Sequence, residues 1–328
     1  MKWICRSDGR WLLPNIGALL FLGIVSSWLA SSSFWVHFAT AALLAIALGL
    51  NIARRASHPK GWASFISLGP AFFGVPLALF GMQHFTEMSV VVGGVPSWMP
   101  GHTFWVCFVG IALIAAALSL ITEIKHHLAA LLAGIMLFLF VLLIYVPAAV
   151  GNPYDRFEVA LLFRDLALSG GALALASTPL AERRPNFAWL AVVARFFFAV
   201  PMLFFGVEHF RHPQFAPGVP LEKLMPPWIP GPMAWAYLTG TILVVCGLCL
   251  VFNKGTRVAS ASLGVAYLVL VICIYMPMEI VHPSIEISGE LDYVADTLAV
   301  AGAALLIAGA HTRSAATEGM PNWSNSLT

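Results

Sequence analysis

The chain has 328 residues, of which 60% are hydrophobic and only 10% are charged, and its formal net charge is +2. This composition contains more apolar surface than a water-soluble core buries, so it excludes a soluble fold and indicates several membrane-spanning helices. The small net charge and the lack of a long basic cluster in the sequence argue against nucleic acid as a partner.

The first sixty residues are predicted to form a transmembrane helical hairpin. Lys2, Arg6 and Arg10 precede an apolar run at 11–30, and a second apolar run at 34–52 follows directly. Small residues between the runs resemble a signal-peptide cleavage site, but the second run favours an uncleaved segment. Whether it crosses the membrane once or twice stays open.

Eight further apolar segments follow, each close to the ~20 residues that a helix needs to cross the hydrocarbon. They are expected at 62–84, 102–122, 127–149, 157–178, 187–209, 232–252, 257–279 and 291–310. The predicted fold class is therefore an all-α polytopic membrane protein with about ten transmembrane helices, ending in a polar tail at 314–328.

One stretch of the sequence occurs twice. The segment Phe72–Phe85 returns 125 residues later as Phe197–Phe210, with eight of 14 positions identical. A second block returns 130 residues later, so five residues are inserted in the second connecting loop. Similarity at this long, steady spacing indicates an internal duplication. We expect two four-helix repeats, at 61–184 and 185–313, after the hairpin at 1–60.

The basic residues are distributed unevenly between the predicted connections. With an internal N-terminus, twelve lie on one side of the membrane, whereas the other side has only Arg156, Arg211 and Lys223. This asymmetry predicts cytoplasmic termini, and we expect the inner (plasma) membrane of a bacterium. Because each repeat has an even number of helices, both would insert in the same orientation, as two parallel bundles.

The polar residues shared by the two repeats fall in the outer halves of the predicted helices: His84 and His209, Tyr145 and Tyr275, and Asp165 and Asp296. An ionised carboxylate in hydrocarbon is costly, so each aspartate should find a donor inside the bundle. We expect one Asp/His/Tyr cluster per repeat, able to bind a ligand or handle a proton. The alternative is structural: each histidine would bond to a loop carbonyl or to the neighbouring aspartate.

Arg164 adjoins Asp165 in a predicted helix and has no counterpart in the second repeat. Adjacent residues on a helix do not face each other, so we expect its partner on another helix.

The repeated stretch also contains a proline and a glycine. Pro76 and Pro201 should bend their helices, because proline lacks the N–H of the regular ladder. Gly81 and Gly206 should let helices approach closely. Kinks and glycines are common in membrane helices, so pure architecture is an alternative to a functional role for these four residues.

Four tryptophans flank the predicted outer loops: Trp98, Trp228, Trp105 and Trp235. Indole rings prefer the membrane–water interface, so these residues are expected to anchor helix ends rather than to line a cofactor site. No complete metal-binding motif is present in the sequence, and the histidine spacing does not favour haem ligation.

Together these motifs resemble the DoxX-like family of four-helix membrane proteins. The resemblance rests on Phe-Gly-x-x-His-Phe at the end of the first helix, Val-Pro-x-Trp-x-Pro-Gly in the loop, Tyr-x-Pro in the third helix and an aspartate in the fourth. It covers about 62–178 and again about 187–310, although Ala295 replaces the arginine in the second copy. The resemblance implies the fold more firmly than the activity.

Some members of that family are subunits of quinone-linked oxidoreductases, and others associate with thiol or redox enzymes. The resemblance therefore implies an accessory or quinone-binding component of a membrane redox system, with other subunits of that system as partners. A small-molecule transporter and a structural or assembly subunit stay open as alternatives. Quinone is the cofactor to test first, and neither a reaction nor an enzymatic role is assigned.

Overall fold

A computed structural model of the chain describes residues 32–55, 61–284, 287 and 289–318. Two compact units are distinguished, Met1–Leu43 and Leu44–Thr328. Helix α2 (Ser32–Arg55) begins in the first unit and ends in the second, and it includes the apolar run expected at 34–52. The other expected run of the hairpin, at 11–30, lies outside the described residues.

Eight helices in the described part of the chain are long and apolar enough to cross a membrane: Trp62–Thr86, His102–Thr122, His126–Gly151, Arg156–Leu180, Trp189–Arg211, Pro232–Val251, Thr256–Val281 and Glu290–His311. Their bounds agree with the eight segments expected after the hairpin to within a few residues. An all-α integral membrane protein with multiple spans is thus confirmed.

The spans are built from named helices. The first half contains α3 (Trp62–Ile66), α4 (Gly69–Thr86), α5 (Met88–Gly93), α6 (His102–Thr122), α7 (His126–Phe140), α8 (Val146–Gly151) and α9 (Arg156–Arg183). A 3₁₀ turn (Pro185–Phe187) precedes the second half, which contains α10 (Trp189–Arg211), α11 (Pro232–Val251), α12 (Thr256–Leu270), α13 (Met276–Val281) and α14 (Glu290–Glu318).

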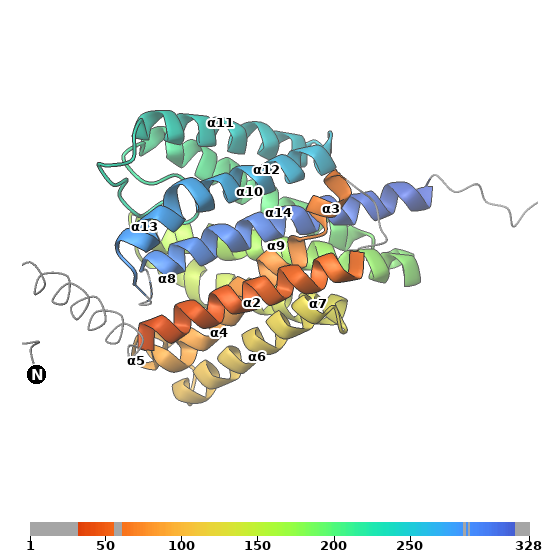
Figure 1. Ribbon diagram of the computed structural model, residues 1–328. Helices are drawn as coiled ribbons and strands as arrows, with labels where there is room; N and C mark the ends of the chain where they lie inside the picture. Colours follow the sequence, from red (N-terminus) through yellow and green to blue (C-terminus); the bar gives the residue numbers. More distant parts are fainter. Residues whose placement is uncertain (1–31, 56–60, 285–286, 288, 319–328) are drawn as a thin grey trace, which may run out of the picture. The chain divides into compact units, whose positions relative to one another are not determined.

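Helices α9 and α14 hold the eight spans together (Figure 1). Helix α9 packs on α7, α10 and α14, and α14 packs on α12, α4 and α9. The first span of each half therefore packs on the last span of the other half, and among the described elements α4 has no extensive contact with α9. This differs from the expected pair of self-contained bundles, because the two halves are interlocked.

Glycines at the helix crossings explain how closely α9 and α14 approach their neighbours. A Cβ atom added at Gly171 would lie 2.4 Å from the Cβ of Ala303, and one added at Gly302 would lie 2.4 Å from the backbone nitrogen of Phe73. Real Cβ atoms do not tolerate such distances, so backbones meet here only because a side chain is missing.

The third span of each half contains a turn of π-helix that the sequence reading did not predict. These turns are Val141–Tyr145, between α7 and α8, and Val271–Tyr275, between α12 and α13. In the first, the N–H of Val146 donates to the carbonyl of Val141, five residues earlier. A proline follows at 147, and its ring would clash with a carbonyl in an ordinary helix, so a wider turn before it relieves the clash.

The prolines and glycines of the repeated stretch lie inside the bundle. Pro76 and Pro201 are buried within α4 and α10, and both helices continue past them. A Cβ atom at Gly81 would lie 2.8 Å from the carbonyl oxygen of Gly110 on α6. One at Gly206 would lie 2.7 Å from the side chain of Val244 on α11. Each glycine thus lies where its helix crosses the next span.

Candidate functional site

A buried charge cluster joins the two central helices. Arg164 on α9 donates from Nε to the Oδ1 atom of Asp165 at 2.9 Å, and from Nη1 to both carboxylate oxygens of Asp296 on α14 at 3.2 Å. Only 3% of Asp165 and 2% of Asp296 is exposed. Tyr145 lies within electrostatic range of all three residues. One cation thus neutralises one of two buried carboxylates.

Two expectations about this cluster need correction. Arg164 does find a partner on another helix, Asp296, but its Nε also contacts its neighbour Asp165. The two aspartates were expected in separate clusters, each with a histidine. They instead share one arginine, because α9 and α14 pack against each other.

Each histidine bonds to its own helix. The Nδ1 atom of His84 lies 2.7 Å from the carbonyl oxygen of Phe80, and that of His209 lies 2.6 Å from the carbonyl oxygen of Phe205. His209 is completely buried, and its Nε2 atom accepts a hydrogen bond from the N–H of Gly218 at 3.1 Å. This pattern requires a neutral ring with its proton on Nδ1. The structural alternative expected a loop carbonyl or an aspartate as the partner, whereas His209 bonds to a carbonyl of its own helix and to a loop N–H.

The loop after α10 folds back into the end of the bundle. Residues Ala216–Leu221 are all buried, and we call them the plug segment. Tyr275 donates to the carbonyl of Ala216 at 3.2 Å, and Arg156 donates to the carbonyl of Leu221 at 3.2 Å. Together with His209, these side chains satisfy backbone groups that would otherwise be buried without partners.

The first half has no equivalent of the plug segment. Its loop contains helix α5, none of whose residues is buried, and His84 is only half-buried. The five inserted residues of the second loop therefore correspond to extra chain that covers the bundle. Trp98 and Trp228 are 67% and 47% exposed in these loops, whereas Trp105 and Trp235 are partly buried.

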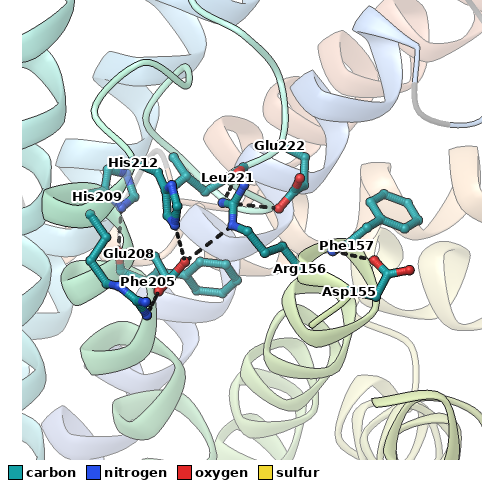
Figure 2. A network of polar contacts seen from close by, with 10 residues as sticks. Asp155, Arg156, Phe157, Phe205, Glu208, His209, His212, Leu221 and Glu222 are labelled. Atoms are coloured by element: carbon teal, nitrogen blue, oxygen red, sulfur yellow. Dashed lines mark hydrogen bonds and ion pairs between the residues drawn. The ribbon is translucent and has the colours of Figure 1, made fainter. Parts of the chain in front are cut away.

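A second group of charges surrounds the plug segment, and Figure 2 shows it from close by. The Nε atom of Arg156 lies 3.6 Å from a carboxylate oxygen of Glu208, and its Nη2 atom lies 3.4 Å from one of Glu222. Glu208 also accepts a hydrogen bond from Arg211 at 3.0 Å and lies 3.5 Å from Nε2 of His212. Two arginines and two glutamates thus balance one another at this end of the bundle.

These charges line a cavity of about 340 Å³ between α9, α10 and the loop. Its polar wall consists of Arg156, Glu208, Arg211, His212 and Glu222, and its apolar wall includes Val159, Ala160, Phe204 and Phe205. Phe204 is held flat against Phe163 of α9, with ring centroids 4.0 Å apart. The volume lies within the usual range for small-molecule sites, and one apolar wall opposite a few polar groups is their usual construction.

Burial affects the two titratable groups of this wall that lie in the loop. It raises the pKa of Glu222, and the nearby Arg156 opposes this effect only in part. Burial, with Arg156 and Arg211 adding to it, lowers the pKa of His212. The shift favours the neutral form of the His212 ring, and the two arginines and two glutamates pair with one another, so the wall suits a neutral, hydrogen-bonding head group.

The sequence reading missed the cavity residues. One signal was available for Glu208, because it is matched by Gln83 in the repeated stretch. Gln83 donates to Asp292 of α14 at 3.1 Å, whereas Glu208 lies beside Arg156 of α9. Both positions therefore link the first span of one half to the last span of the other. Arg156 was also one of only three basic residues predicted for this side of the membrane.

No group of three histidine, cysteine or acidic side chains that could hold a metal ion occurs among the residues whose positions are described.

Comparison with known proteins identifies one family. Residues 190–276 match DoxX, a range that includes His209, Trp228, Trp235 and Tyr275 but ends before Asp296. No curated protein and no solved structure matches the chain. Residues 190–276 are thus similar to DoxX, and they belong to an integral membrane protein whose described residues include eight membrane-length helices.

Proposed function

We propose that this protein binds a small, neutral amphiphile such as a quinone in the cavity beside Arg156, as an accessory component of a membrane redox system. The observation that carries the proposal is the cavity itself. It pairs the aromatic ring of Phe204 with the charge-balanced group around Glu208. A quinone offers a flat ring to the first wall and carbonyl or hydroxyl oxygens to the second.

The charge cluster at Arg164 supports proton handling near this site. Arg156, Ala160 and Arg164 succeed one another at one-turn spacing along α9, and Phe163 packs on the cavity residue Phe204. When both carboxyl groups beside Arg164 are ionised, they carry one more negative charge than the arginine neutralises. A proton taken up there would remove that excess, and an aspartate placed so can serve as a proton acceptor.

Lipid extraction tests the binding proposal. The protein is purified in a neutral detergent, and the bound lipids are extracted and separated by liquid chromatography. We expect close to one quinone per chain in the wild type. The change Ala160→Phe fills the cavity from α9 and should abolish the bound quinone, whereas Glu208→Gln should reduce it.

Glu87→Gln is the matched control, because Glu87 lies at the end of the first span of the other half and does not line the cavity. It should retain the wild-type amount of quinone. A wild-type protein that contains no quinone, and binds none when a short-chain quinone is added, would refute the proposal.

The same proposal includes two tandem DoxX-like units with cytoplasmic termini, in a bacterial inner membrane. The matched π-helical turns at Val141–Tyr145 and Val271–Tyr275 support the duplication, since each ends at the tyrosine of a Tyr-x-Pro motif. The orientation rests on the basic residues of the loops. Cysteine labelling of exposed loop positions in cells tests it, with Ser97 expected to react from outside and Asn253 from inside.

A scaffold is the second candidate, favoured by the interlocked helices and by the way Arg164 joins α9 to α14. In a pure scaffold, Ala160→Phe would leave the lipid content unchanged, and Asp165→Asn would alter stability alone. For the third hypothesis, a transporter, uptake into proteoliposomes is the discriminating measurement.

A further inference from the structure

A second cavity, of about 180 Å³, lies at the end of the bundle opposite His84 and His209. It is enclosed by the start of the first span, the C-terminal parts of α9 and α14, and the beginning of α12. Its walls are mainly apolar, with Ile66, Leu305 and Leu306 among them. Polar groups come from the hydroxyls of Ser67 and Thr178 and from the guanidinium of Arg257.

The polar groups differ in how firmly they are placed. Ser67 and Thr178 are each only 9% exposed, and the carbonyl of Ser67 accepts a hydrogen bond from Asn51 of α2 at 2.8 Å. Arg257 is exposed, and it has no ion-pair partner within the described part of the chain. The Ser67 hydroxyl donates to the carbonyl of Ser64, so the hydroxyl of Thr178 and the unneutralised cation at the edge are the groups left for a ligand.

The surroundings of the cavity are positively charged. The connections at this end contain Lys125, Arg183, Arg184 and Lys254, against Glu123 and Glu182. Helix α12 begins at Thr256 without a side-chain cap, so the N–H groups of its first turn add to the positive potential beside Arg257.

We propose that this second cavity binds the head group of an anionic phospholipid. The phosphate would lie against Arg257 and the hydroxyl of Thr178, and the glycerol and upper acyl chain would lie on Ile66, Leu305 and Leu306. Basic pockets between membrane helices on the side rich in lysine and arginine are suited to such head groups. The site is separate from the cavity beside Arg156 and does not depend on its ligand.

Thermal unfolding of delipidated protein, followed by tryptophan fluorescence, tests the proposal. Phosphatidylglycerol should raise the unfolding midpoint in a saturable manner, and phosphatidylcholine with the same acyl chains should not. Arg257→Gln should raise the half-saturating concentration of phosphatidylglycerol roughly fivefold, as expected for the loss of one basic contact. Arg257→Lys should restore most of the wild-type response.

Lys223→Gln is the control, because it removes an equal charge at the opposite end of the bundle and does not line the cavity. It should respond like the wild type. An equal response of Arg257→Gln and the wild type would overturn the assignment of the site, and so would an equal effect of phosphatidylcholine. A saturable shift of the same size with inorganic phosphate alone would overturn the lipid as the occupant.

Discussion

Replacing Arg164 by leucine is the sharpest test of the buried charge cluster. The change leaves Asp165 and Asp296 without their shared cation, and the side chains of the two aspartates are only 4% and 3% exposed. Breaking a buried ion pair by removing one partner costs about 3–5 kcal/mol, mainly because a charge stays buried without compensation. Because two carboxylates stay behind, we expect the free energy of unfolding to fall by an amount in the upper part of that range. Uptake of a proton by one of them would make the loss smaller.

The assay is equilibrium unfolding in mixed micelles with increasing sodium dodecyl sulfate, followed by circular dichroism. Arg211→Gln is the matched control: its pair with Glu208 is also an arginine–carboxylate contact, but the arginine side chain is 68% exposed. An exposed pair contributes about 0–1 kcal/mol.

A rescue variant separates the charge effect from lost packing. Asn at both aspartate positions, added to Arg164→Leu, removes the uncompensated charge and should restore a large part of the stability. If Arg164→Leu is no more destabilising than Arg211→Gln, or if the triple variant is less stable than Arg164→Leu alone, the cluster does not join α9 to α14 as described.

Three further changes test the plug segment, the helix crossings and the titration of the loop. Tyr275→Phe removes the bond to Ala216 and should lower the free energy of unfolding by about 1 kcal/mol and speed protease cleavage of the loop, whereas Tyr154→Phe, at a residue 92% exposed, should do neither. Gly302→Ala should lower the free energy of unfolding by about 1–3 kcal/mol, because the new Cβ meets the backbone of α4. In the control Gly49→Ala the new Cβ has no neighbour within 4 Å, so this variant should be neutral or slightly stabilising. Burial raises the pKa of Glu222, so the folded chain holds that proton more tightly than the unfolded chain; the resulting stability is full below the ordinary pKa of 4.5 and is lost as the pH rises through the raised pKa. The midpoint of the wild type should therefore fall relative to that of Glu222→Gln across this window.

Each of these predictions has an outcome that contradicts it. Equal cleavage rates for Tyr275→Phe and Tyr154→Phe would mean that the hydroxyl does not hold the plug segment. A tolerated Gly302→Ala would mean that α14 and α4 are less close than described. Parallel pH curves for the wild type and Glu222→Gln would mean that the Glu222 carboxyl is solvated like an ordinary one.

The sequence by itself determined the class of protein and the position of eight spans. A helix in hydrocarbon must satisfy its backbone hydrogen bonds internally and must be about 20 apolar residues long, so hydropathy and length are local signals that locate each span. The sequence also showed the five extra residues of the second loop, but it did not show that this loop folds into the end of the bundle.

Tertiary structure alone decided which polar residues meet. Asp165 and Asp296 lie in equivalent helices, and their sequence positions are consistent with two separate clusters as well as with the single one at Arg164. The single cluster forms because α9 crosses α14 at Gly171 and because α4 and α10 each pack on the other half. No local sequence pattern encodes these contacts between helices. Likewise, His209 and Tyr275 bind backbone groups of the plug segment because the loop turns inward, and the path of a loop is set by the surface it covers. A membrane span can be recognised from the hydropathy of about twenty consecutive residues. A binding site in this protein, by contrast, needs side chains from helices and a loop that lie far apart in the chain.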